Sequence, residues 1–184
     1  MSRIETTETL RTVLKSQYHA SLAMLRQAIE KCPEDLWYNA EQPNAFWQLA
    51  YHTLFFAHLY LQPNAAAFQP WKNQRRNVQN EDCLTRPPDP NSNLPLLPDP
   101  YSRDQVLEYW DVCDAMVDSA VDAFDPLNPE SGFSWYSVSK LEHQIVNIRH
   151  IQHGAAHLAA RLRATRDVGL DWVGAGRGRQ SKDA

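Results

Sequence analysis

Proline and glycine divide this 184-residue chain into four segments that can be helical. Proline breaks helix interiors and glycine weakens them, and both fall almost wholly between segments 7–31, 44–62, 102–124 and 139–166. Within each segment apolar residues recur every three or four positions, which is the period of an amphipathic helix. The sequence therefore predicts an all-α fold, a four-helix bundle whose helices bury their apolar faces together.

The connection between the second and third segments, residues 63–101, is long and contains eight prolines. Connections of this length are uncommon in compact domains and are often lids, binding loops or wrapping segments. Its larger apolar residues predict a crossover that packs onto the helices: Phe68, Trp71, Leu94, Leu96 and Leu97. We expect one domain over residues 1–166, followed by a flexible C-terminal tail over residues 167–184.

Composition narrows the functional classes. A net charge of -4 disfavours nucleic acid as a partner, and no apolar run is long enough to cross a membrane. The N-terminal residues lack the apolar core of a signal peptide, so we expect a cytoplasmic protein. The three cysteines show no CxxC spacing, which argues against a disulfide framework and against a thiolate zinc site.

The fourth segment has two contrasting faces. An aliphatic stripe, expected to face the core, consists of Leu141, Ile145, Ile148, Ile151, Ala155 and Leu162. The nearly opposite face holds His143, Val146, His150, His153 and His157. One of the two faces must leave the main core or line a cleft. If the histidine face is simply exposed to solvent, the His153–His157 pair has no functional role and binds a metal ion only weakly.

Three of these histidines suit a metal site. His153 and His157 are four residues apart, which places both rings on one helix face. His52 is predicted on the buried stripe of the second segment, whereas His58 is predicted nearer its rim. Three imidazoles would leave a coordination position for water or substrate, as in catalytic metal sites. Nitrogen ligands without thiolate favour Zn²⁺ or Ni²⁺ over Fe²⁺ or Mn²⁺.

Other ionisable residues are assigned to roles outside the ligand set. His150, one turn before His153, is a candidate acid–base group. His19 lies nearly opposite the apolar face of the first segment and is predicted to be solvated. The third segment carries an acidic stripe, also predicted to face solvent: Asp104, Glu108, Asp111, Asp118 and Asp122.

From about residue 5 to 165 the chain resembles the DinB-like (YfiT-like) metalloenzyme superfamily. The resemblance rests on Pro33-Glu-Asp-Leu-Trp37, on Phe46-Trp-Gln-Leu-Ala-Tyr-His52-Thr-Leu-Phe-Phe56, and on Asn147-Ile-Arg-His-Ile-Gln-His153-Gly-Ala-Ala-His157. It implies a four-helix bundle with a long crossover between helices two and three. It also implies a metal ion held by His52, His153 and His157. Many members continue with Arg-Gly-Gln where this chain has Leu158-Ala-Ala.

The resemblance implies a metal-dependent enzyme, of the thiol S-transferase or hydrolase type, acting on an unidentified small molecule. A low-molecular-weight thiol would be the co-substrate of the transferase type. Two alternatives remain: a non-enzymatic helical stress-response protein with a structural or adventitious metal, and a ligand-binding protein with an apolar pocket. Helical proteins of this kind often pair through an exposed face, so we also expect a homodimer.

Overall fold

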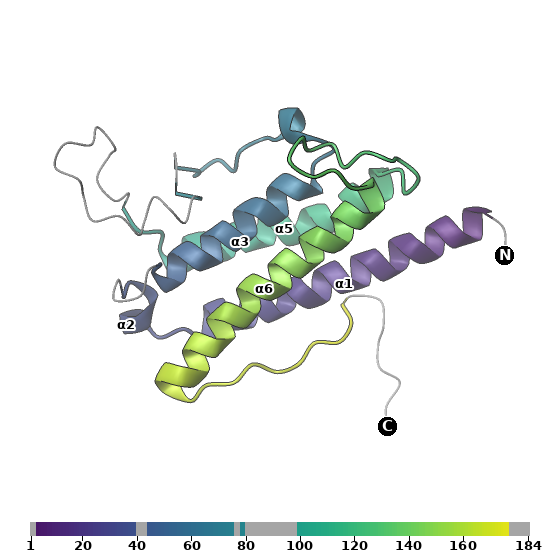
Figure 1. Ribbon diagram of the computed structural model, residues 1–184. Coiled ribbons are helices and arrows are strands. Elements are labelled where there is room, and N and C mark those ends of the chain that lie inside the picture. Colours follow the sequence, from purple (N-terminus) through teal and green to yellow (C-terminus); the bar gives the residue numbers. More distant parts are fainter. Residues whose placement is uncertain (1–2, 40–43, 76–77, 80–98, 177–184) are drawn as a thin grey trace, which may run out of the picture.

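The computed structural model describes residues 3–39, 44–75, 78–79 and 99–176, and in this part of the chain every regular element is helical (Figure 1). Most of the predicted crossover, including Leu94, Leu96 and Leu97, lies outside the described residues. The helices are α1 (Arg3–Lys31), α2 (Glu34–Trp37), α3 (Phe46–Leu61), η1 (Ala65–Ala67), α5 (Arg103–Ala123) and α6 (Lys140–Arg166).

The helix ends follow from local chemistry. Ser102 caps α5, accepting a hydrogen bond from the Gln105 backbone N–H, while the Gln105 side chain accepts one from the Ser102 N–H. Ser139 caps α6 by accepting a hydrogen bond from the N–H of Glu142. At the other end of α6, Asp167 adopts a left-handed conformation with φ 52° and donates its N–H to Arg163. The four long helices therefore lie within a few residues of the predicted segments.

The long helices pack in a definite order. α1 and α3 each pack against both α5 and α6 but have few contacts with one another. In Figure 1 α6 crosses in front of α1 and α3, while α5 lies behind. No helix in the described part of the chain is both long and apolar enough to span a membrane.

α3 is buried almost all round, because it is apolar on every side. Every residue of α3 is buried except His52 and Phe56, which are half-buried. The predicted orientation of this helix was therefore wrong: His58, expected near the rim, is 4% exposed, and His52 lies at the rim. A helix without a polar face offers no periodicity from which its orientation can be read.

The buried face of α6 lies between the two predicted stripes, because α6 packs against α1 on one side and α3 on the other. Ile145, predicted to face the core, is 49% exposed. Two of the buried polar residues of α6, Gln144 and Asn147, form hydrogen bonds within the core. Gln144 accepts a hydrogen bond from the Tyr18 hydroxyl, and the Asn147 amide donates one to the Ala57 carbonyl.

Residues 167–176, here called the C-terminal strap, run back along α1 rather than away from the helices (Figure 1). Asp171 and Gln27 exchange two hydrogen bonds, and the N–H of Gly176 donates to the Ser16 carbonyl at 2.9 Å. The predicted flexible tail began at residue 167, so it overlaps this ordered strap. Its remaining residues, 177–184, lie outside the described part of the chain.

Candidate metal centre

The close crossing of α3 and α6 positions the candidate site. A Cβ atom added to Gly154 would lie 2.1 Å from Oγ1 of Thr53, so only glycine allows this approach. His52 precedes Thr53 on α3, and His153 precedes Gly154 on α6. The contact between the two small residues therefore places one predicted ligand from each helix beside the crossing point.

The side chain of His52 is held by Gln79, in the predicted crossover. Its Nδ1 atom lies 2.7 Å from the carbonyl oxygen of Gln79. Because a carbonyl only accepts, Nδ1 must donate, and in the neutral ring the lone pair then lies on Nε2. A histidine oriented by a backbone carbonyl in this way is typical of metal-binding imidazoles. Its ring also packs against Phe56, with centroids 4.8 Å apart.

His150 is the histidine of α6 that faces His52, with ring centroids 5.5 Å apart. Its Nε2 is buried and has no hydrogen-bond partner among the described residues. The pKa of His150 is lowered to about 4, mainly by burial and also by the neighbouring His52 and His153, against a smaller opposing effect of the Thr53 backbone. His150 is therefore neutral at pH 7 and carries an unsatisfied ring nitrogen within the cluster.

His153 and His157 lie together on the exposed side of α6, with ring centroids 4.1 Å apart. The four histidines thus form a continuous group that runs from His52 through His150 to this pair. As the rings stand, however, no three histidine, cysteine, aspartate or glutamate side chains of the described residues are arranged to hold a metal ion. The fold thus brings histidines of α3 and α6 near one another without forming a three-ligand group among the described residues.

An open hollow of about 500 Å³ adjoins His150 and His153 on α6. Arg149 and Gln152 supply its other polar groups, and Val146 and Ala156 its apolar ones. The sequence placed His150 on this face but gave no indication of the hollow. The hollow lies beside the histidines and carries the Arg149 guanidinium, so it is the recess nearest to them in which a substrate could lie.

Two other buried histidines lie apart from this group. His143 is fully buried among the rings of Tyr60, Phe133 and Tyr136, and His58 lies 3.0 Å from the Tyr109 hydroxyl. The pKa of each is lowered to about 4, by burial and, for His143, also by the charge of Lys140. Both are core residues, and neither belongs to the candidate site.

The predicted exposure of His19 was wrong. Its side chain is 5% exposed, with Nδ1 2.6 Å from Asp114 and Nε2 3.1 Å from Asp118. Both ring nitrogens meet carboxylates, which accept hydrogen bonds, so the ring donates twice and is the charged imidazolium. The hydrogen bond to Asp114 is the main reason that the pKa of His19 is raised. The only sequence signal was that Asp114 and Asp118 share one face of α5, four residues apart.

The chain matches no protein-family model, no curated protein and no solved structure.

Proposed function

We propose that this chain is a DinB-like four-helix bundle, with residues 63–101 as its crossover, that binds a divalent transition metal between α3 and α6. The ligands would be His52, His153 and His157, and the ion Zn²⁺ or Ni²⁺ before Fe²⁺ or Mn²⁺. One observation carries the proposal: the Gly154–Thr53 contact lets α3 and α6 approach closely where each presents a histidine.

Binding would require the exposed rings of His153 and His157 to rotate toward His52. Both side chains are at the surface, so rotation meets no packed core. His52 is already oriented through its Nδ1 by the Gln79 carbonyl. The site would then take two ligands from the exposed pair, His153 and His157, and a third from His52, whose ring is held by a hydrogen bond.

We infer a metal-dependent enzyme of the thiol S-transferase or hydrolase type. A bound divalent ion would lower the pKa of a water or thiol in its remaining position and so supply a nucleophile at neutral pH. His150 lies beside His52 and has a buried, unpaired Nε2, which would take up a proton from that nucleophile. Arg149, in the adjoining hollow, would orient an anionic group of a small substrate or of a low-molecular-weight thiol.

Metal analysis of untagged protein, purified without added metal, tests the ligand set. About one equivalent of metal is expected in the wild type and none in His52→Ala or His153→Ala. Ile145→Ala, an exposed truncation on the same helix, is the control and should retain the metal. Circular dichroism should show the same helix content in all four proteins. Stoichiometric metal retained by both histidine variants would contradict the proposal.

The alternative is a non-enzymatic helical protein whose surface pair, His153 and His157, binds metal adventitiously. It is favoured by the observation that these two rings are adjacent while His52 contacts Phe56 and His150 instead. A His52→Ala protein with wild-type metal affinity, beside a His157→Ala protein with none, would establish this alternative. The absence of any thiol-dependent or hydrolytic turnover would accompany it.

A further inference from the structure

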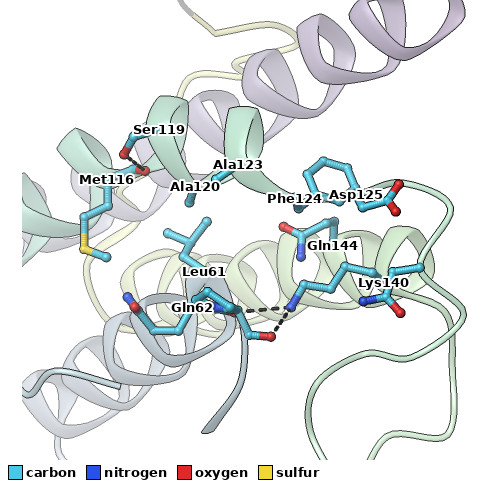
Figure 2. Close-up of a pocket in the computed structure, with 12 residues that line it drawn as sticks. Leu61, Gln62, Met116, Ser119, Ala120, Ala123, Phe124, Asp125, Lys140 and Gln144 are labelled. Carbon is cyan, nitrogen blue, oxygen red and sulfur yellow. Dashed lines mark hydrogen bonds between the residues drawn. The ribbon is translucent and has the colours of Figure 1, made fainter. Parts of the chain in front are cut away.

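A second recess lies away from the histidines of the candidate metal centre, where the ends of α3 and α5 meet the start of α6 (Figure 2). It is a cavity of about 440 Å³, within the size range of small-molecule binding sites. Gln144, its innermost residue on α6, precedes His150 by six residues, or about 9 Å along the helix. The cavity is therefore separate from the candidate metal centre.

Lys140 brings a buried positive charge to this cavity. Its side chain is 6% exposed, and Nζ donates to the carbonyls of Gln62 at 3.2 Å, Pro63 at 2.9 Å and Ser131 at 2.8 Å. All three acceptors are uncharged, and no carboxylate among the described residues forms an ion pair with Lys140. Burial consequently lowers the pKa of Lys140. A cation surrounded only by neutral dipoles favours an anion in the adjoining space.

Gln144 adds a hydrogen-bond donor on the same side. Its side chain is 3% exposed, and Oε1 accepts from the Tyr18 hydroxyl at 2.8 Å, which fixes the orientation of the amide. No hydrogen bond joins its Nε2 to another residue in the described part of the chain. Figure 2 shows the amide extending beside Lys140 toward Leu61, whereas the Asp125 carboxylate points away from the other labelled side chains. The three N–H groups of Lys140 are taken by carbonyls, so Lys140 contributes its charge to the cavity and Gln144 contributes the free donor. The Asp125 carboxylate points elsewhere.

One part of the wall is hydrocarbon, contributed by Leu61 of α3 and by Met116, Ala120 and Phe124 at the end of α5. Polar residues also belong to the lining: Gln62, Ser119, Asp125 and Asn128. We propose that this cavity binds a small organic carboxylate, with its carboxylate group beside Lys140 and Gln144 and its apolar body against the hydrocarbon part of the wall. The site needs no metal and does not depend on the proposed enzymatic function.

Hexanoate is a suitable probe, compared with hexanamide and hexylamine of the same chain length. Each is titrated into the full-length protein by isothermal titration calorimetry, with a chelator present so that metal binding at α3 and α6 does not contribute. We expect saturable one-to-one binding of hexanoate, weaker binding of hexanamide and none of hexylamine. Equal binding of hexanoate and hexylamine, or no saturable binding of hexanoate, would overturn the proposal.

Two variants locate the bound carboxylate without removing the lysine, whose loss would leave three buried carbonyls without a donor. Gln144→Glu keeps an acceptor for Tyr18 but replaces the amide donor with a carboxylate beside Lys140. We expect hexanoate to bind about tenfold more weakly, or not at all, at an unchanged helix content. Unchanged affinity in this variant would contradict the placement.

Ala120→Leu tests the apolar wall, because the larger side chain enters the cavity. The exposed Ala115 on the same helix provides the matched control Ala115→Leu. Hexanoate affinity should fall in the first variant and remain at the wild-type value in the second. An equal effect of both substitutions would argue against binding in this cavity.

Discussion

Histidines in this chain occupy two opposite environments. Between α1 and α5, His19 is enclosed by two carboxylates and is charged, with its pKa raised. Between α3 and α6, His150 is surrounded by rings and other histidines, and its pKa is lowered to about 4. Burial acts against the charged ring in both places, so the difference comes from the partners. Charge at the first site joins two helices, whereas the second site keeps His150 neutral with an unpaired ring nitrogen.

The largest expected effect is at the charged site. Asp114→Ala removes the buried partner of His19 and leaves an imidazolium with one exposed carboxylate, Asp118. Breaking a buried ion pair in this way typically destabilises a protein by about 3–5 kcal/mol. Urea unfolding monitored by circular dichroism measures the loss. A change below about 1 kcal/mol would show that His19 is not held as an ion pair, and the contrast between the two sites would disappear.

The pKa of the neutral histidines is lowered, so the stability that they contribute should depend on pH in the sense opposite to that of His19. The folded-state pKa of His143 is about 4, below the ordinary value of 6.5, so the native state binds fewer protons than the unfolded state between these values. Stability should therefore fall as the pH is lowered from about 6.5 toward 4, by on the order of 3 kcal/mol for this residue. His143→Phe should reduce this acid sensitivity. An identical pH dependence in wild type and variant would show that His143 is not buried in neutral form.

Gly154→Ala tests the backbone contact on which the α3–α6 site depends. The added methyl group would meet Thr53 Oγ1 at 2.1 Å, and overpacking of this kind costs about 1–3 kcal/mol. Separation of the helices should also weaken metal binding, although no ligand is changed. The exposed neighbour substitution Ala156→Ser is the control. Unchanged metal affinity in a destabilised Gly154→Ala protein would imply that His153 and His157 bind without His52.

The smallest effect concerns the exposed member of the charged site. Asp118 is 61% exposed, so Asp118→Asn should destabilise the protein by less than about 1 kcal/mol. Its clearer signature is the pKa of His19, which should fall toward the ordinary value in an NMR titration. Because the folded-state pKa of His19 is raised, its stabilising effect is complete below the unfolded-state value and is lost as the pH rises through the folded-state value. An unshifted titration in Asp118→Asn would assign the whole effect to Asp114.

The sequence predicted the long helices well because their ends depend on local chemistry. Ser102 and Ser139 cap the helices that follow them, and each requires only residues within one turn. Helix orientation was predicted less well, since α3 is apolar all round and offers no contrast between faces. The expected exposures of His52 and His58 were consequently reversed: His58 is buried and His52 lies at the rim.

The candidate site could be predicted only in part. The spacing of His153 and His157 places both on one side of α6, and spacing within a helix is a local property. The pairing of His19 with Asp114 joins residues 95 positions apart, which no periodicity reveals. Whether His52 and His150 face one another likewise depends on how closely α3 and α6 approach at Gly154. Convergence of three rings on one ion depends further on rotamers, which the sequence does not specify.

The C-terminal strap has a consequence for how this chain folds during synthesis. α1 is made before α5 and α6, yet it packs against both and is hydrogen-bonded from Ser16 to Lys31 by residues of the strap that follows α6. The part of its apolar face that packs against α6 therefore stays uncovered until a helix that begins more than 100 residues after the end of α1 has left the ribosome. During synthesis α1 thus exposes apolar surface that the completed fold buries.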